Sequence, residues 1–173
     1  MKKKILGILV LFATIFFSCK GTINTVRYSE NSPKKFKRAF IISLENSEYI
    51  KFKFGNFTYA GYLPSKDDKA KKVEVIGNTD TIIKRELEKR GILAVIGKKG
   101  DEPENFDLIV KYKDKWRWDF KKILDELEIS FISPKGNKVI AKSHFSIYKN
   151  KELHNFPTPE KEVPKMIKEL IGK

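Results

Sequence analysis

Residues 106–145 contain the stretch that decides the fold, FDLIVKYKDKWRWDFKKILDELEISFISPKGNKVIAKSHF. Its first part alternates strictly between two parities. One parity carries Phe106, Leu108, Val110, Tyr112, Trp116 and Trp118, interrupted only by Asp114, and the other carries Asp107, Ile109, Lys111, Lys113, Lys115 and Arg117. Side chains of a strand point alternately to opposite faces, so this pattern predicts a long strand with one buried and one solvated face.

The same alternation recurs twice further along this stretch. Leu127, Ile129 and Phe131 are predicted to face inward, with Glu126 and Glu128 outward. Pro134-Lys135-Gly136-Asn137 then gives a turn, after which Val139, Ala141, Phe145 and Ile147 are predicted to face inward and Lys138, Lys142 and His144 outward. Three consecutive alternating strands predict an antiparallel meander.

The remaining elements complete an α+β fold. Arg38–Ser43 is a short apolar run typical of a buried strand. A helix is predicted from Asn78 or Thr79 to Gly91, with Ile82, Ile83 and Leu87 on its apolar side, followed by a strand at Ile92–Ile96 buried on both faces. A last helix opens at Thr158-Pro159-Glu160 and carries Val163, Met166, Ile167 and Leu170. We expect a mixed sheet with a strand-helix-strand start, the three-stranded antiparallel meander and a C-terminal helix.

An aromatic segment at residues 49–62 interrupts this pattern. Ile50, Phe52 and Phe54 alternate with lysines, and Gly55-Asn56 offers a turn into residues 57–62, which suggests a hairpin. Because the segment stands outside the regular sheet pattern, its aromatic side chains are candidates for a partner contact or a small apolar pocket. These candidates are Phe52, Phe54, Phe57 and Tyr59.

The amino terminus has the features of a lipoprotein leader. Three lysines precede 13 uncharged residues, Ile5–Phe17, and Ser18 comes directly before Cys19. The apolar run is too short to span ~30 Å of hydrocarbon, which takes about 20 residues, and it fits a secretory leader. A small residue followed by the only cysteine resembles the lipobox of bacterial lipoproteins, although Phe16 replaces the usual aliphatic residue. The alternative is an ordinary cleaved leader with an incidental thiol.

The leader sets the expected domain organisation and location. Residues 1–18 form the leader, 19–35 the lipidated cysteine with a flexible tether, and 36–173 a single periplasmic domain. A lipid on Cys19 would hold the protein to the bacterial cell envelope. Lys20 stands where an aspartate would signal inner-membrane retention, which favours the outer membrane, facing the periplasm.

The composition suits a packed domain with an excess of positive charge. Hydrophobic residues make up 40% and aromatic residues 12% of the chain. Without the three lysines of the leader, 33 Lys and Arg face 22 Asp and Glu, a net charge near +11. This excess suits anionic partners in the envelope, but we favour the simpler explanation of a biased genome, with lysines that solvate the surface. A nucleic-acid partner does not suit an exported protein.

The alternating cations Lys111, Lys113, Lys115 and Arg117 form a ridge on one face of the predicted strand. The neighbouring strand turns Glu126 and Glu128 to the same face, and the third strand adds Lys142 and His144. Cross-strand pairing then predicts a self-neutralised surface with Lys115 and Arg117 left unpaired. These two cations and Trp116 between them are candidates for a partner contact, although the parity of Trp116 favours the core.

No catalytic or metal-binding pattern stands out. Gly97-Lys98-Lys99-Gly100 lacks the spacing of a phosphate loop and predicts a basic turn. The two histidines, His144 and His154, have no cysteine or carboxylate at metal-ligand spacing. We therefore expect no enzyme, no metal and no cofactor. A pocket gathering Asp107, Glu126 or His144 would favour an enzyme instead.

Residues 106–145 also carry a family resemblance. The aspartate-led alternating strand, the tryptophan-containing turn and the Pro-x-Gly hairpin resemble small bacterial lipoproteins grouped as domains of unknown function. The element order is more loosely similar to periplasmic domains of the Tol-translocation amino-terminal type and of curli-secretion lipoproteins. These resemblances imply an envelope location and an α+β fold, and they imply no activity.

Two hypotheses of function follow from the sequence. The first is a non-catalytic envelope lipoprotein, held by Cys19, that binds another envelope component, in the first place a protein. The second is a carrier of a small apolar ligand that uses the aromatic segment 49–62 as its pocket or lid.

Overall fold

The computed structural model describes residues 22–28, 36–45, 47–51, 56–58, 61–63, 75–119, 121–147 and 156–172. The strands are β1 (Thr22–Arg27), β2 (Arg38–Ile42), β3 (Glu48–Lys51), β4 (Asn56–Thr58), β5 (Gly61–Leu63), β6 (Leu93–Gly97), β7 (Leu108–Asp119), β8 (Lys121–Ile132) and β9 (Val139–Ser146). The helices are α2 (Thr79–Glu88) and α3 (Pro159–Ile171). This mixture of a sheet and helices confirms the predicted α+β class.

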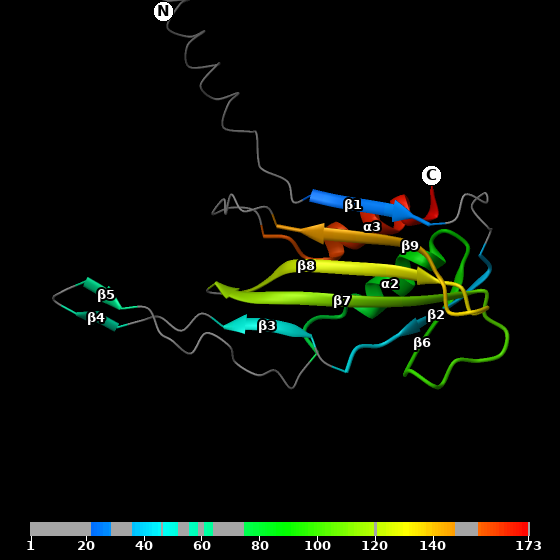
Figure 1. The fold of residues 1–173 in the computed structure, drawn as a ribbon, viewed down its shortest axis with the longest axis horizontal. Helices are drawn as coiled ribbons and strands as arrows, with labels where there is room; N and C mark the ends of the chain where they lie inside the picture. Colours follow the sequence, from blue (N-terminus) through cyan, green and yellow to red (C-terminus); the bar gives the residue numbers. More distant parts are fainter. Residues whose placement is uncertain are drawn as a thin grey trace, which may run out of the picture.

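Seven strands form one mixed sheet (Figure 1). Its order is β1-β9-β8-β7-β2-β6, and β3 pairs with a further part of β7. Strands β7, β8 and β9 are antiparallel neighbours, whereas β2 is parallel to both β6 and β7. Strands β4 and β5 form a separate antiparallel hairpin that joins residues 56–58 to 61–63. The predicted hairpin, with its turn at Gly55-Asn56, is therefore wrong, because Asn56 is the first residue of β4 and β3 pairs with β7.

Strand β1 corrects the predicted tether, which covered residues 19–35. It runs antiparallel to β9 along its whole length and closes one edge of the sheet. Thr25 donates a hydrogen bond from Oγ1 to Oγ of Ser143 on β9 at 2.9 Å, and Ile23 packs partly against the core. The segment TINTVR is rich in β-branched residues, which favour extended backbone even where the stretch as a whole is polar.

Both described helices cover the same face of the sheet. Helix α2 contacts β2 and β6, helix α3 contacts β1, β8 and β9, and the two helices contact each other. The core lies between this helix layer and the sheet, as Figure 1 indicates, and it includes Ile41, Leu108, Val110, Leu127, Ile129, Phe131, Phe145, Ile82, Ile83, Leu87, Val163, Met166 and Ile167. The apolar residues predicted for the two helices are therefore confirmed as core residues.

Strand β6 was predicted to be buried on both faces, and this prediction is wrong. Leu93 is 64% and Val95 48% exposed, while Ala94 between them is buried. The reason is topological, because β6 is the edge strand and helix α2 covers only one of its faces. A continuous apolar run cannot by itself distinguish a central strand from an edge strand.

On the face opposite the helices, a second small cluster fixes the loop between β6 and β7. The ring of Phe40 is 1% exposed and meets the ring of Phe106 edge-on, with their centroids 5.6 Å apart. Gly97 lies directly beneath this ring, and a Cβ atom there would be 2.6 Å from Cζ of Phe40. The cluster ties both ends of the loop at residues 98–107 to the sheet.

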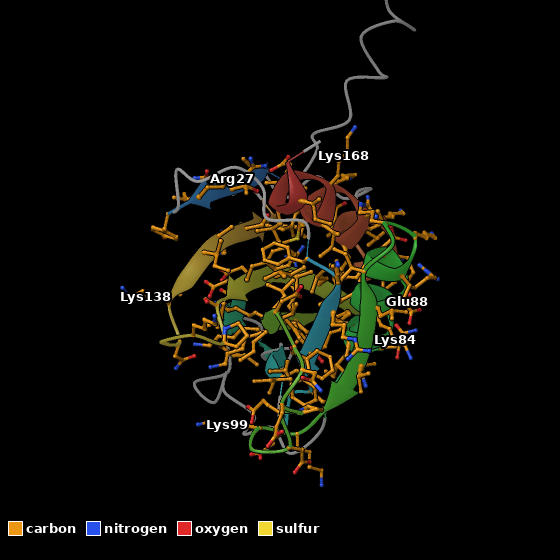
Figure 2. The ribbon with its side chains drawn as sticks, turned by 90° about the vertical axis from the view of Figure 1, so that its right-hand side faces the viewer. Arg27, Lys84, Glu88, Lys99, Lys138 and Lys168 are labelled. Carbon is orange, nitrogen blue, oxygen red and sulfur yellow. The ribbon has the colours of Figure 1, made fainter. Side chains whose placement is uncertain are left out.

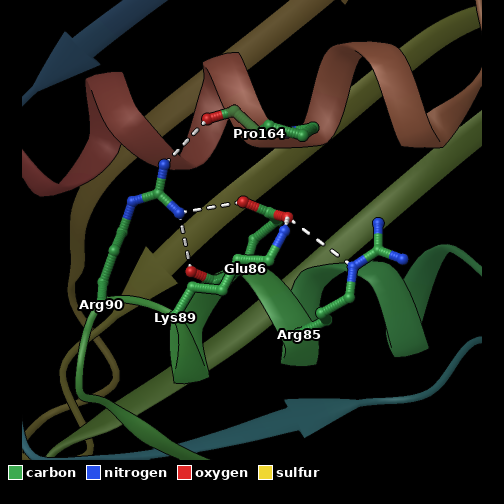
Figure 3. A network of polar contacts seen from close by, with 5 residues as sticks. All are labelled: Arg85, Glu86, Lys89, Arg90 and Pro164. Carbon is green, nitrogen blue, oxygen red and sulfur yellow. Dashed lines mark hydrogen bonds and ion pairs between the residues drawn. The ribbon is translucent and has the colours of Figure 1, made fainter.

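A polar network joins the two helices (Figure 3). Glu86 on α2 is only 3% exposed, and its carboxylate accepts hydrogen bonds from Lys89 at 2.7 Å and from Arg90 at 3.0 Å. The Arg90 guanidinium also donates to the carbonyl oxygen of Pro164 on α3 at 3.3 Å. Glu86 therefore orients the arginine that bridges the helix layer.

Candidate functional site

The face of the sheet that the helices leave uncovered carries the predicted charged side chains. The outward parity of β7 presents lysines and an arginine, that of β8 presents glutamates, and that of β9 presents Lys142 and His144. We call this the open face. Figure 2 shows two cations away from the helices, Lys99 and Lys138, whereas Lys84 and Lys168 project from α2 and α3.

The ion pairs on the open face join adjacent strands. Glu128 lies 2.7 Å from Nζ of Lys142, and Glu126 lies 3.6 Å from Nζ of Lys115. The other oxygen of Glu126 lies 4.0 Å from Nε2 of His144. Both glutamates are thus engaged, in agreement with the predicted cross-strand pairing.

Arg117 has an acidic partner that the sequence pattern did not reveal. The pairing of β7 with β8 shifts between Lys115 and Trp116, so that Lys115 is opposite Glu126 while Trp116 is opposite Leu124. Asp125 is the extra residue of this bulge. It lies 3.3 Å from Nε of Arg117. The prediction that Lys115 and Arg117 are the unpaired cations is therefore wrong.

The cations left without an acidic partner are instead at the other end of the ridge. Lys113 is directly opposite Glu128 in the register, but the Glu128 carboxylate pairs with Lys142 on the far side. This hydrogen bond raises the pKa of Lys142, because it stabilises the charged ammonium group. Within the described residues, Lys111 and Lys113 form no ion pair.

A groove lies beside these two lysines. Its volume is about 350 Å³, within the range of about 300–1,000 Å³ for small-molecule sites. Aliphatic side chains and cations both line it: Ile42, Leu44, Ile132 and Val139, with Lys99, Lys111 and Lys113, and in addition Tyr112, Glu128 and Ser130. The groove is the candidate functional site, since it brings together unpaired charge and apolar surface.

Val139 reaches the groove because of a second bulge. It was predicted to face inward with Ala141, but it is 43% exposed whereas Ala141 is 2% exposed. Ala141 is opposite Phe131, and Val139 is opposite Ile132, so the extra residue is Ile140. One inserted residue reverses the parity of the strand beyond it, which turns Val139 to the open face.

The described residues that the sequence predicted as contacts do not line the groove. Trp116 is 5% exposed within the core, so its indole cannot serve as a stacking surface, as its parity indicated. Lys115 and Arg117 are both paired. Phe52, Phe54, Tyr59 and the lipidation candidate Cys19 lie outside the described residues, as does His154, and for Phe57 only the backbone, in β4, is described.

The residues considered for acid-base chemistry have structural partners. Asp107 accepts hydrogen bonds from the backbone N–H groups of Lys37 and Arg38 at 2.8 and 3.0 Å, which fixes the entry into β2. No group of three or more His, Cys, Asp or Glu residues within the described ranges could hold a metal ion. Nor does the described part of the chain contain a helix both long and apolar enough to cross a bilayer.

Tyr112 is part of a buried polar group behind the groove, near the start of α2. Its side chain points toward the helix layer and is 3% exposed. Burial, reinforced by the nearby carboxylate of Asp80, raises the pKa of Tyr112 far above its usual value. Asp80 itself accepts a hydrogen bond from Oγ of Ser43, the residue after β2, at 3.1 Å.

This environment predicts loss of stability at alkaline pH. Because the pKa of Tyr112 is higher in the folded protein than in the unfolded chain, its neutral hydroxyl contributes fully to stability below pH ~10, the pKa of an unfolded tyrosine. This contribution is lost progressively as the pH rises above that value. Replacing Tyr112→Phe should flatten this decline between about pH 9 and pH 11. Urea unfolding at several pH values measures it, with Tyr28→Phe, at an exposed site, as the control. Equal slopes for the three proteins would contradict the assignment.

The sequence signal for the groove was incomplete. Lys111 and Lys113 belong to the predicted ridge, but nothing in the pattern singled them out. Lys99 was assigned to a basic turn, and its backbone neighbours do form one, with the Asp101 N–H donating to the carbonyl of Lys98 at 3.1 Å. Ile42 and Leu44 fall at the end of a predicted strand. Only the tertiary structure brings the loop, the strand end and the ridge together.

Comparison with known proteins supports the fold. No family model and no curated protein matches the chain. A dodecamer of a point variant of PelC from Paraburkholderia phytofirmans superposes with a TM-score of 0.53 at 12% sequence identity, over 89% of this chain and 100% of that chain. A DUF4136 family protein from Bacteroides thetaiotaomicron superposes with a TM-score of 0.50 at 8% identity, over 88% of this chain and 96% of that one. At these identities the likeness shows the fold alone, and the second structure agrees with the resemblance of the sequence to uncharacterised domains.

Proposed function

We propose that this protein is a lipid-anchored, non-catalytic binding module of the bacterial cell envelope, and that the groove on the open face is its binding site. The observation that carries the proposal is the groove itself, where Lys111 and Lys113 have no acidic partner among the described residues and lie beside apolar surface. Elsewhere on the open face, the cations of β7 and β9 are matched by carboxylates. Unmatched charge next to apolar surface is typical of a ligand site.

The strand β1 supports a membrane-proximal location for this module. It begins at Thr22, three residues after Cys19. Three extended residues span at most about 11 Å, so a diacylglycerol on Cys19 would hold the edge of the sheet within that distance of the bilayer surface. The proposed location is the outer membrane, facing the periplasm.

The chemistry of the groove favours binding over catalysis. Among the described lining residues the one carboxylate, Glu128, forms a close ion pair with Lys142, and the other polar side chains on the open face are those of the lysines and Ser130. Lysines and hydroxyls without an adjacent base hold an anion but do not activate a nucleophile. The carrier hypothesis based on residues 49–62 falls largely outside the described residues, whereas the groove gives a described site for the same kind of ligand.

The anchor is tested by mass spectrometry and fractionation of the full chain expressed in a bacterium. We expect the processed chain to begin at Cys19 with an added diacylglycerol and to sediment with membranes. Cys19→Ala should abolish the modification and block processing by the lipoprotein pathway. An unmodified terminus on a protein recovered from the soluble fraction would contradict the anchor.

Binding is tested in cells by placing a photoreactive amino acid at position 113, in the groove. The matched control carries it at position 84, on the outer side of α2 and half exposed. We expect light-dependent attachment of one defined envelope component from position 113 and none from position 84. Equal attachment, or none from either position, would reject the groove as the binding site.

A further inference from the structure

We infer that the ligand of the groove is a fatty carboxylate, a single acyl chain with an anionic head. This inference rests on the proposed function and names the class of ligand for the same site. It follows from the lining of the groove, which combines four aliphatic side chains, here called the floor, with three lysines.

The floor is suited to an acyl chain. Ile42 and Leu44 at the end of β2, Ile132 of β8 and Val139 of β9 are all aliphatic. They come from three strands, and the second bulge is what adds Val139 to them. A flexible chain gains affinity about threefold to fourfold for each buried methylene, and an aliphatic floor gives no hydrogen bonds that would select a sugar or a polar peptide.

The lysines of the lining determine the charge of the head group. Lys111 and Lys113 project from alternate positions of β7, and Lys99 reaches the groove from the loop that Phe40 and Phe106 tie down. Within the described residues none of these three lysines forms an ion pair. The single carboxylate of the lining, Glu128, has its charge balanced by Lys142 at 2.7 Å. An anionic head group is therefore attracted, and a cationic one is repelled.

Other occupants fit this arrangement less well. A protein partner needs a contact area of roughly 1,000 Å² or more, whereas the volume of the groove, about 350 Å³, is that of a small-molecule site. A polyanion would need a track of cations, but the ridge beyond Lys113 is neutralised at Lys115 and Arg117. One chain with one acidic head uses both the floor and the lysines.

The test is photoaffinity labelling of the full chain in its membrane with dodecanoate that carries a diazirine near its methyl end. Mass spectrometry of the labelled peptides locates the attachment, so that probe in the bilayer is not mistaken for probe in the groove. We expect attachment within residues 42–44, 130–132 and 139. Unlabelled dodecanoate should compete, and dodecyltrimethylammonium of the same chain length should not.

Competitors of different chain length and matched variants of the protein give the expected changes in affinity. Octanoate should compete roughly 100-fold less well, because each methylene changes affinity about threefold to fourfold. Lys111→Gln with Lys113→Gln should weaken competition by dodecanoate about tenfold. Lys84→Gln with Lys168→Gln removes the same charge from the helix layer and should leave it unchanged. Val139→Asp, at a half-exposed position, places a carboxylate in the floor and should also weaken it about tenfold.

The outcomes separate this inference from the proposed function. Equal competition by the cationic and anionic probes, or unchanged competition in the lysine variant, would overturn the inference. If position 113 captures a protein and dodecanoate labels nothing in the groove, the binding function stands and the ligand class is wrong. If neither probe attaches there, both proposals are rejected.

Discussion

Replacing Gly97 with alanine is expected to lower the free energy of unfolding by about 2–3 kcal/mol. The added Cβ would meet Cζ and Cε2 of Phe40 at 2.6 and 2.7 Å, which is well inside van der Waals contact. The Phe40 ring has little room to move aside, since it is buried and packed edge-on against Phe106. Backbone conformation is not the cause, because Gly97 lies in a regular strand and lacks a positive φ.

Chemical denaturation measures this effect, and a double-mutant cycle tests its cause. Phe40→Leu alone should destabilise the protein, because it removes part of a buried ring. In the Gly97→Ala protein, Phe40→Leu should lower the free energy of unfolding less, or even raise it, since it removes the clashing atoms. Strictly additive effects would show that the Phe40 ring does not limit the size of residue 97.

The same contact links stability to the candidate site. Phe40 and Phe106 hold the loop at residues 98–107 on the open face, and that loop supplies Lys99 to the groove. A ring displaced by alanine at position 97 would move the loop with it. Gly97→Ala should therefore also weaken dodecanoate binding, whereas a destabilising change in the helix layer should not.

The alternation predicted correctly which side chains are buried over residues 108–116, but its inward assignment of Phe106 is wrong, because that ring packs against Phe40 on the opposite face. Leu108, Val110, Tyr112 and Trp116 all face the helix layer, and so does Asp114, which the pattern marked as an interruption. Hydrophobic periodicity works here because one face of the strand is buried from Leu108 to Trp116. The same logic predicted the inward faces of α2 and α3.

The failures at β8 and β9 have a single physical origin. Two bulges, one that adds Asp125 and one that adds Ile140, change which side chains share a face. No local pattern predicts them, because a bulge depends on how two strands accommodate each other. The first supplies a partner to Arg117 and the second turns Val139 outward, so that both the unpaired lysines and the apolar floor had to be found in three dimensions.

Pairing of charges was also beyond a local prediction. Lys113 and Glu128 are opposite each other in the register, and a rule based on nearest cross-strand neighbours would pair them. Glu128 instead selects Lys142 on β9. A carboxylate between two basic strands can pair with either one, and the choice depends on side-chain positions that the sequence does not encode in a readable way.

Replacing Glu86 with alanine is expected to cost about 2–3 kcal/mol of unfolding free energy. Its carboxylate is buried at the junction of the two helices and accepts charged hydrogen bonds from Lys89 and Arg90. Without it, Arg90 is no longer held where it donates to Pro164 on α3, so the helix layer loses its polar connection. Glu88→Ala, two residues away, removes an exposed carboxylate whose pair with Lys84 is 3.8 Å long, and it should cost well under about 1 kcal/mol.

The pH dependence of stability distinguishes the contribution of the charge of Glu86 from the contribution of its packing. Burial alone would raise the pKa of Glu86, but the hydrogen bonds from Lys89 and Arg90 outweigh it and hold the pKa below its usual value near 4.5. Because the pKa of Glu86 is lowered in the folded protein, its carboxylate contributes fully to stability above pH ~4.5. This contribution is lost as the pH falls through the folded-state pKa. The difference in unfolding free energy between the natural protein and Glu86→Gln should therefore narrow at acidic pH. The difference between the natural protein and Ile83→Ala, a purely apolar change on the same helix, should stay constant. A gap for Glu86→Gln that does not change between about pH 7 and pH 3 would mean that the glutamate stabilises the helices by its shape rather than its charge.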